Sequence, residues 1–535
     1  MEQRAVQGDY LWLPVHPGAP KRHVEIVCGR EKAFEMEIPC ALPEAGAPAE
    51  ETGGFYACLR AADYRGRTLR FEGAPAGWAA CLKDADAPPA PPACPRPLLH
   101  FTPPVGWIND PNGLVYFQGN YHLYYQYNPY DVAWGNMTWG HAHSPDLLQW
   151  QWDDPVLHPD GTGTMYSGSA VRDDAGAAGY GPGRVLYYYT AAGGTNRWSA
   201  GRPFEQYLAV GSPDGMRLEK TGRVMVPAAA EGARDPKVFS HAPTKTYGMA
   251  LYLSGEEFAL YRSADLLHWR EASRLCLPGA WECPDLFELA ADDGSRHWVF
   301  WTADGYYFVG GFDGTRFYPQ APRRCAYAGG SVNPPGQAPQ PGVTLLPYAA
   351  QTFSGLEDGR TVSLSWLRTP NPPGGGEGWL PYTGMMALPV ELSLTVDLRL
   401  RMRPVRELAR LRGPRLVLDG GGAEVEGVYE LAVALRSGRL TAELPCGRLE
   451  ADGETGVCRF VSALADRSFS YAPDQPLSLR LIADTGIVEI YAQDGTAVMA
   501  CETAPVLAGR VACRIDGEGE AALIPLFLRS RQSAF

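Results

Sequence analysis

The sequence predicts an all-β protein, and three observations support this fold class. It contains 61 glycines and 47 prolines among 535 residues without a collagen-like period, a content typical of turn-rich β folds. Strand-like runs recur from end to end, whereas the one good helical stretch lies near Val405–Leu411. A phrase that marks a turn also returns at intervals of roughly fifty to seventy residues, as in β architectures built from repeated units.

The first predicted unit is a small accessory β domain at residues 1–86. It contains short strand-like runs, among them His23–Cys28, Ala33–Ile38 and Thr68–Glu72. Residues 87–97 follow as a linker, because six of these eleven residues are proline. Such a stretch cannot enter the interior of a sheet and is expected to act as an extended, semi-rigid spacer.

The second predicted unit is a five-bladed β-propeller at residues 98–395. The phrase Ser144–Trp150, which reads Ser-Pro-Asp-Leu-Leu-Gln-Trp, returns as Ser263–Trp269, with looser copies that begin at Ser212 and Phe312. Each copy follows a strand-like run and therefore marks the same turn of a repeating unit. Five units of roughly sixty residues fit propeller blades, although a large irregular sandwich stays open on the repeat alone.

The third predicted unit is a C-terminal β-sandwich at residues 396–535. Tyr429–Leu435 and Leu477–Leu481 alternate apolar and polar residues with period two, and Asp484-Thr485-Gly486 turns the chain into Ile487–Tyr491. Alternation of this kind is typical of half-buried antiparallel strands in a sandwich.

Composition argues against several classes of partner. The net charge is −13 and no basic block is present, which disfavours a nucleic-acid partner. The sequence has no run of about 18 consecutive apolar residues, the length that a membrane-spanning helix needs. The first residues hold no apolar run, and none of the 12 cysteines lies in a CxxC pair. We therefore expect a cytoplasmic protein with reduced thiols.

Three acidic segments within the predicted propeller are candidates for catalysis. They are Trp107–Gly113, Arg234-Asp235-Pro236 and Trp281–Asp285. Each carboxylate stands among apolar and aromatic residues, where its burial costs free energy unless it is paired or hydrogen-bonded. Taken alone, the Asp-Pro-Asn-Gly sequence in the first segment could also be a simple turn.

Together the three segments match a family pattern. The chain closely resembles glycoside hydrolase family 32, the invertases, inulinases and levanases that cleave β-fructofuranosides, over roughly residues 98 to 530. Further phrases occur in the family's order: His122–Pro129, Trp134–His141, Tyr166–Ser169, Tyr348–Phe353 and the Asp484–Tyr491 hairpin. The resemblance implies a five-bladed propeller joined to a C-terminal sandwich, in agreement with the reading of the repeats.

The resemblance also implies roles for individual residues. Asp110 corresponds to the nucleophile, Glu282 to the general acid/base and Asp235 to the stabiliser of the transition state. Retaining cleavage uses one carboxyl group as nucleophile and a second as acid and base, and needs neither cofactor nor metal. The implied substrate-binding residues are Trp107, Asn109, Gln126, Trp134, Tyr166, Ser167, Arg234 and Trp366. Leu346 departs from the pattern, since family members commonly carry Asp there, which implies a weaker preference for sucrose.

The implied function is hydrolysis that releases terminal fructosyl units from fructans, fructo-oligosaccharides or sucrose. Two alternatives stay open: a fructosyltransferase that uses the same three acids, and an inactive carbohydrate-binding protein. His141 and His143 would lie on one face of a strand with the spacing of two ligands to one metal ion. The sequence shows no third ligand, so we interpret both histidines as structural.

Overall fold

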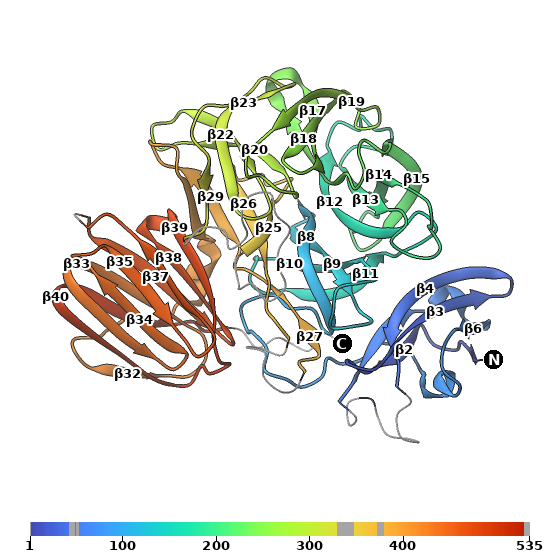
Figure 1. The fold of residues 1–535 in the computed structure, drawn as a ribbon, viewed down its shortest axis with the longest axis horizontal. Coiled ribbons are helices and arrows are strands. Elements are labelled where there is room, and N and C mark those ends of the chain that lie inside the picture. The colour runs from blue at the N-terminus through green and yellow to red at the C-terminus, as the bar shows by residue number, and fades with distance from the viewer. Residues whose placement is uncertain are drawn as a thin grey trace.

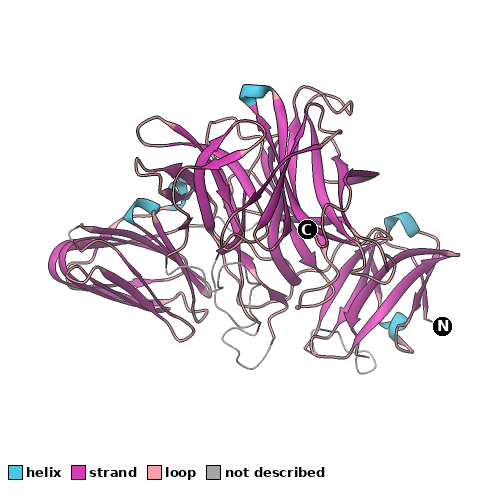
Figure 2. Cartoon of the chain, turned by 45° about the horizontal axis from the view of Figure 1, so that its top comes forward, coloured by secondary structure: helices cyan, strands magenta, loops and turns pink. Residues whose placement is uncertain are grey.

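The computed structural model describes residues 2–41, 49, 53–328, 347–371, 379–473 and 475–528. Figure 1 shows three β units side by side, with the N-terminal domain at one end, the propeller in the middle and the C-terminal sandwich at the other end. Strands dominate throughout, as Figure 2 shows, so the predicted all-β class is confirmed. The described helices are short 3-10 turns: η2 (Ala62–Tyr64), η3 (Trp78–Cys81), η4 (Ala242–Thr244), η6 (Arg406–Leu411) and η7 (Gln493–Gly495). None of them has the length or the apolar character of a membrane span.

The propeller consists of five sheets, each built on four antiparallel strands within the described ranges. The first contains β8 (Gly106–Phe117), β9 (Asn120–Asn128), β10 (Thr138–Ser144) and β11 (Gln151–Leu157). The second contains β12 (Thr164–Asp173), β13 (Arg184–Ala192), β14 (Phe204–Gly211) and β15 (Leu218–Val226). The third contains β16 (Arg234–His241), β17 (Thr246–Ser254), β18 (Glu257–Ser263) and β19 (Arg270–Cys276).

The last two sheets complete the ring. The fourth contains β20 (Asp285–Ala290), β21 (Arg296–Trp301), β22 (Tyr306–Phe312) and β23 (Phe317–Pro319), with β24 (Arg324–Cys325) beside β22. The fifth contains β25 (Pro347–Thr352), β26 (Val362–Leu367), β29 (Val390–Leu394) and β30 (Leu400–Pro404), with β28 (Met385–Met386) beside β26. Because β30 belongs to this sheet, the propeller runs past residue 395, where the sequence placed its end.

The first strands of the five sheets surround the propeller axis. Strands β8, β12, β16, β20 and β25 contact one another in that order, and β25 in turn contacts β8. The ring is closed by β27 (Tyr382–Thr383), which follows the fifth sheet's second strand in the chain but pairs in parallel with Gly106 and Trp107 of β8. Side chains at one end of these five strands are therefore brought together on the axis.

The repeated phrase forms the turn after the third strand of each of the first four sheets. In the first copy the Asp146 carboxylate accepts from the backbone N–H groups of Leu148 and Gln149, and in the second Asp265 does the same for Leu267 and His268. The looser copies place Asp214 after β14 and Asp313 after β22, each again bonded to backbone N–H groups. The predicted repeat is confirmed, and it is a side-chain-capped turn.

The N-terminal domain packs two sheets face to face. One contains β1 (Gln3–Ala5), β6 (Thr68–Glu72), β3 (Lys21–Cys28) and β4 (Glu31–Pro39), and the other contains β5 (Phe55–Arg60), β2 (Tyr10–Val15) and β7 (Lys83–Ala85). Its apolar core also includes Val105, Tyr130 and Val132 of the propeller. The end of the linker is anchored, because Arg96 donates to two backbone carbonyls and lies over the Tyr382 ring at 4.2 Å. The first two units therefore share one continuous core.

The C-terminal unit is a sandwich whose layers share two long strands. Its strands are β31 (Leu416–Val417), β32 (Gly422–Val425), β33 (Tyr429–Leu444), β34 (Gly447–Asp452), β35 (Val457–Val461), β36 (Asp466–Ser470), β37 (Leu477–Asp484), β38 (Ile487–Ala492), β39 (Ala497–Glu502) and β40 (Gly509–Pro525). The pairing of β33 with β40 shifts register between Leu435 and Ser437, where both strands bend from one layer into the other. Gly438 has φ 82° there, and a Cβ would meet the Asp516 carbonyl oxygen at 2.0 Å.

A buried ionic cluster joins the sandwich to the start of the propeller. Asp484 accepts from the backbone N–H groups of Leu98, Leu99 and His100, and its carboxylate lies 2.9 Å from His100 Nδ1. The other ring nitrogen of His100 lies 3.3 Å from Glu489. Although burial opposes a charge here, the two carboxylates raise the pKa of His100 to about 9.

Candidate active site

Two of the three carboxylates reach the axis because irregularities break the inner strands that carry them. The pairing of β8 shifts register between Ile108 and Pro111, and that of β16 shifts between Arg234 and Lys237. Proline has no N–H to pair, so Asp110-Pro111 and Asp235-Pro236 each interrupt a ladder. Asp235 has the left-handed φ of 60°, an uncommon conformation that turns its side chain away from the regular strand direction.

Asp110 is held in place from two sides. Ser167 Oγ, on the neighbouring inner strand β12, donates to Asp110 Oδ2 at 2.7 Å, and Asn109 Nδ2 donates to Oδ1 at 3.2 Å. Trp107 Nε1 donates in turn to Asn109 Oδ1 at 3.0 Å. These contacts fix the orientation of the Asp110 carboxylate and favour its charged form.

Glu282 precedes β20 and receives two different donors. Arg234 Nη2 donates to Glu282 Oε2 at 2.5 Å, and the Tyr348 hydroxyl on β25 donates to Oε1 at 2.5 Å. The Arg234 guanidinium also lies over the ring of Tyr252, at 4.7 Å from its centroid. Both oxygens of Glu282 are thereby oriented by groups from different inner strands.

Asp235 lies between the other two acids and is almost fully buried. Arg234 Nε lies 3.4 Å from Asp235 Oδ2, and the backbone N–H of Cys283 donates to the same oxygen at 3.2 Å. The Cys283 thiol lies 3.6 Å from both Asp110 and Asp235. One thiol thus bridges two of the three carboxylates.

Two of the three acids, Asp110 and Asp235, hold protons more tightly than isolated carboxyl groups do. Burial and the negative charge of Glu282 raise the pKa of Asp110, although its donors act in the opposite direction. Burial is also the main reason that the pKa of Asp235 is raised to about 7, against the opposing effect of Arg234. Asp235 therefore retains its proton at a pH where free aspartic acid has lost its own.

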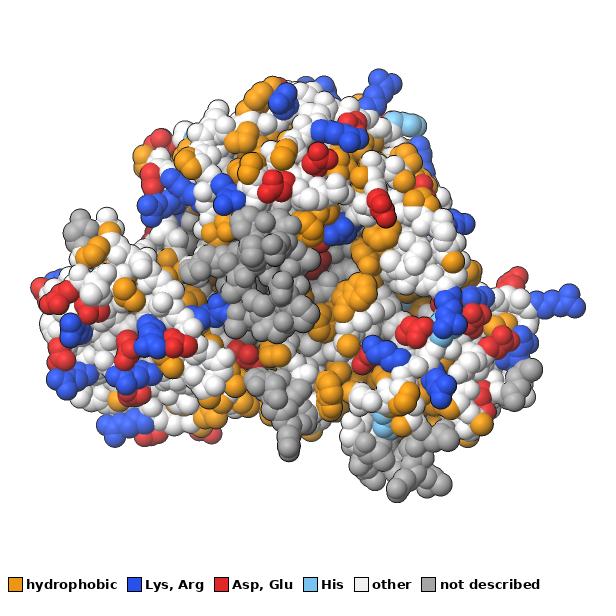
Figure 3. Space-filling view, viewed as in Figure 1, with side chains coloured by type: hydrophobic (Ala, Val, Ile, Leu, Met, Phe, Trp, Pro, Cys, Tyr) orange, Lys and Arg blue, Asp and Glu red, His pale blue; other side chains and the backbone are white. Residues whose placement is uncertain are grey.

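Aromatic rings form two walls beside the acids. On one side the Trp107 and Trp366 rings meet at 5.8 Å between centroids, and Trp366 contacts Tyr348 at 6.1 Å. On the other side Tyr166 contacts Trp134 at 6.1 Å. Burial is the main reason that the pKa of the Tyr166 hydroxyl is raised to about 12; the charge of Arg234 lowers this pKa, and the charges of Asp235 and Glu282 raise it. Figure 3 shows the face of the molecule hollowed near the centre, with acidic atoms inside the hollow.

Gln126 is the predicted site residue that the structure moves away from the acids. Only 2% of it is exposed, and its Nε2 donates to the Met165 carbonyl at 2.9 Å, so it makes no contact with Asp110. Asn112 lies between them: with its amide oxygen toward Gln126, it accepts from Gln126 Nε2 at 2.9 Å and donates to Ser167 Oγ at 3.3 Å. Gln126 therefore acts on Asp110 through Asn112 and Ser167.

The structure brings the other ten predicted site residues to this end of the axis and adds residues that sequence reasoning did not assign. Tyr348 and Arg368 are the clearest, since Tyr348 bonds Glu282 and the Arg368 guanidinium lies 4.0 Å from the Tyr348 ring centroid. Tyr348 opens the phrase Tyr348–Phe353 and Asn112 lies in the segment Trp107–Gly113, both noted in the sequence, whereas no pattern marked Arg368. Leu346 lies outside the described residues.

The histidine pair belongs to the wall of the first sheet. His141 Nε2 lies 3.0 Å from His122 Nδ1, its Nδ1 lies 3.3 Å from Asp153, and His143 bonds the same carboxylate at 2.7 Å. Among the described residues the one grouping with metal-like spacing is His23, Glu25 and Glu35. Lys32 Nζ already lies 3.0 and 2.9 Å from its two carboxylates and offsets part of their negative charge.

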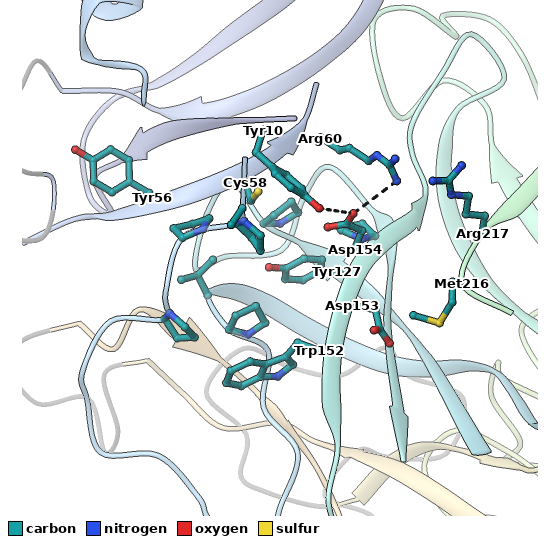
Figure 4. Close-up of a pocket in the computed structure, with 18 of the residues that line it drawn as sticks. Tyr10, Tyr56, Cys58, Arg60, Tyr127, Trp152, Asp153, Asp154, Met216 and Arg217 are labelled. Carbon is teal, nitrogen blue, oxygen red and sulfur yellow. Dashed lines mark hydrogen bonds and ion pairs between the residues drawn. The ribbon is translucent and has the colours of Figure 1, made fainter. Parts of the chain in front are cut away.

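A cavity of about 530 Å³ between the N-terminal domain and the propeller contains none of the predicted site residues. Figure 4 shows Tyr10 and Arg60 facing Asp154 across it. Asp154 accepts from Tyr10 at 2.9 Å and lies 3.7 Å from Arg60, and Asp153 binds His143. Since these polar groups are occupied by one another, the cavity is a domain contact and the acids on the axis mark the site.

Comparison with known proteins agrees with this geometry. The family model described as glycosyl hydrolases family 32 N-terminal domain matches residues 100–404, which is more than half of the chain. The chain belongs to glycoside hydrolase family 32.

Relatives within family 32 differ in how much of their length is matched. A levanase of Bacillus subtilis is 34% identical over 353 residues, which cover 59% of this chain and 48% of that protein. The chain thus spans about half the length of that relative. A sucrose-6-phosphate hydrolase of Escherichia coli is 32% identical over 455 residues, covering 76% of this chain and 89% of that protein.

Solved structures show the same fold. The exo-inulinase of Aspergillus awamori superimposes with a TM-score of 0.68 at 22% identity and covers 81% of this chain and 98% of that one. The sucrose-6-phosphate hydrolase of Lactobacillus gasseri gives a TM-score of 0.66 at 22% identity, covering 81% of this chain and 93% of that one. The predicted propeller and sandwich are therefore confirmed as a family 32 fold.

Proposed function

We propose that this family 32 protein is a retaining glycoside hydrolase that releases terminal β-D-fructofuranosyl units from fructans, fructo-oligosaccharides or sucrose. The observation that carries the proposal is the convergence of Asp110 on β8, Asp235 on β16 and Glu282, just before β20, into one aromatic-walled pocket. The relatives named levanase, exo-inulinase and raffinose invertase support this choice of substrate.

In the first step Glu282 donates a proton to the oxygen that leaves with the rest of the substrate. Asp110 attacks the anomeric carbon from the opposite side, so the glycosidic C–O bond breaks as an ester bond to the enzyme forms. In the second step Glu282 takes a proton from water, the hydroxide attacks the same carbon, and Asp110 leaves as a carboxylate. Two inversions give net retention of configuration.

The surrounding residues supply orientation and charge. Ser167 and Asn109 hold Asp110 in one rotamer for attack, and Tyr348 and Arg234 hold Glu282. Asp235 is placed to accept hydrogen bonds from ring hydroxyls, which strengthen as positive charge develops on the sugar. The first step requires Glu282 to carry a proton while Asp110 is ionised.

We further propose that the enzyme acts at the end of the chain and works in the cytoplasm. Trp107 and Trp366 on one side of the acids, and Trp134 and Tyr166 on the other, bound the space beside them, which supports binding of a single terminal unit. The twelve cysteines are all free thiols, which supports a reducing compartment.

The test is a product profile after incubation with sucrose, inulin and levan, with the Asp110→Asn protein as the control. We expect free fructose from the first minutes with the unaltered protein and none with the control. Early release of mixed oligosaccharides would contradict action at chain ends, and larger fructans would favour transfer over hydrolysis. No product from any of the three would overturn the proposal.

A further inference from the structure

A cleft of about 560 Å³ lies where the N-terminal domain meets the propeller, and Trp134 borders both this cleft and the active site. Strands β3 and β4 contribute Lys21, His23 and Glu37 to it, and propeller loops contribute Asn136 and Arg197. In Figure 3 acidic and basic side chains gather to the lower right of the central hollow, over the N-terminal domain. The cleft therefore adjoins the active site at Trp134, on the side of this domain.

The connection to the acids runs through two aromatic rings. Tyr166 lies within the electrostatic influence of Arg234, Asp235 and Glu282, and its ring meets that of Trp134 edge to face. Trp134 is 52% exposed, an unusual state for a tryptophan in a propeller that buries most of its aromatic residues. An exposed ring between two cavities offers an apolar platform to the face of a sugar ring.

The N-terminal side of the cleft is fixed to the propeller. The Glu37 backbone N–H donates to Asn136 Oδ1 at 2.8 Å, and Asn136 Nδ2 donates back to the Glu37 carbonyl at 2.8 Å. The buried Glu35 carboxylate accepts from the Trp198 backbone N–H at 2.9 Å, next to Arg197. Lys21 also lies 2.6 Å from Asp131 of the propeller. A ligand would therefore meet a preformed surface.

The exposed side chains around Trp134 include both positively and negatively charged ones. The side chains of Arg197, Glu37 and Lys21 are 70%, 49% and 48% exposed. They supply hydrogen-bond donors and acceptors, as a chain of sugar hydroxyl groups requires. Glu37, 3.9 Å from Arg197, and the nearby Glu35 offset the positive charges, which disfavours a phosphorylated ligand and favours a neutral one.

We propose that this cleft binds the sugar units that follow the cleaved bond in a longer oligosaccharide. The N-terminal domain then supplies a binding site for the leaving group and makes the enzyme prefer short fructan chains to sucrose. This inference rests on the proposed function, because it assumes that the terminal unit occupies the pocket beside Asp110.

The experiment measures binding separately from turnover. Calorimetry compares the affinity of the Asp110→Asn protein for sucrose and for an inulin-type pentasaccharide. The cleft variant adds Lys21→Ala, Glu37→Ala and Arg197→Ala. A matched control adds Arg30→Ala, Glu31→Ala and Arg202→Ala, which removes the same charges from exposed positions outside the cleft.

We expect the cleft variant to bind the pentasaccharide at least about fivefold more weakly, because three polar contacts worth up to tenfold each are lost. Binding of sucrose should change less than about twofold, and the control should match the Asp110→Asn protein for both sugars. An unchanged affinity for the pentasaccharide, or an equal loss for both sugars, would overturn the inference. Absence of turnover of either sugar by the unaltered protein would instead refute the proposed function.

Discussion

Arg234 stands between two of the three carboxylates, and we predict that its replacement by glutamine moves the acid limb of the pH–rate profile upward. In the unaltered protein Arg234 Nε lies 3.4 Å from Asp235 and opposes the rise in the pKa of that residue. At this distance and an effective dielectric constant of about 20, a unit charge stabilises the ionised form by about 5 kcal/mol. Since one pKa unit corresponds to about 1.36 kcal/mol, the upper limit of the shift exceeds three units.

Water that enters the vacated space replaces part of this stabilisation, so we expect the acid limb of kcat/KM to move up by about 1 to 3 pH units. The assay is hydrolysis of sucrose between about pH 4 and 9. Arg368→Gln serves as the comparison, because it removes the same charge from the pocket but breaks no ion pair among the described residues. If the acid limb of Arg234→Gln stays where it is in the unaltered protein, the assignment of Arg234 as the cation of the trio is wrong.

Three further changes test other parts of the structure. Asp110→Asn should lower kcat at least about 10⁴-fold with unchanged circular dichroism, because the amide cannot form the fructosyl ester; residual activity of a few per cent would place the nucleophile elsewhere. Asp235→Asn should abolish activity but raise the melting temperature at pH 8 by about 2 °C or more. The pKa of Asp235 in the folded protein is about 7, above the ordinary 3.8, so ionisation of this buried carboxyl group lowers the stability of the fold as the pH rises from 3.8 to 7. The pKa of His100 is raised to about 9, so its protonation contributes roughly 3 kcal/mol at most to the stability of the fold. This contribution is complete below pH 6.5 and is lost as the pH rises through 9, so the melting temperature of the unaltered protein should fall between about pH 7 and 9.5. His100→Gln should remove that fall. Parallel melting curves of the two proteins against pH would exclude that contribution.

The propeller and the acid trio could be predicted because their signals are local. A capped turn such as Ser144–Trp150 is stabilised by hydrogen bonds among its own few residues and needs no contact with distant segments. Each copy can therefore be recognised in the sequence. The same holds for Asp110-Pro111 and Asp235-Pro236, where proline both breaks the strand and marks the acid.

Other features depend on contacts between distant segments, and these could not be predicted. Whether Gln126 reaches Asp110 is decided by Asn112, which occupies the space between Gln126 and Ser167. The packing of the N-terminal domain was hidden because Tyr130 and Val132 resemble ordinary core residues of the propeller, although they complete the core of the other domain. The shift of the propeller boundary beyond residue 395 has the same origin, since β30 is recognised only by its pairing with β29.

The parallel pairing of β27 with β8 has a consequence for the order of events during synthesis. The inner strand of the first sheet leaves the ribosome early, but Tyr382 and Thr383, its partners at the ring closure, follow almost the whole propeller sequence. Pairing across such a separation is slow, because the entropy of closing the intervening chain is lost before the contact forms. Until then the edge of β8 that carries Gly106 and Trp107 lacks its final neighbour, and a nascent chain halted before residue 382 presents that edge to other strands. The ring closure therefore leaves this edge of β8 without its partner from early in translation until residues 382 and 383 have been made.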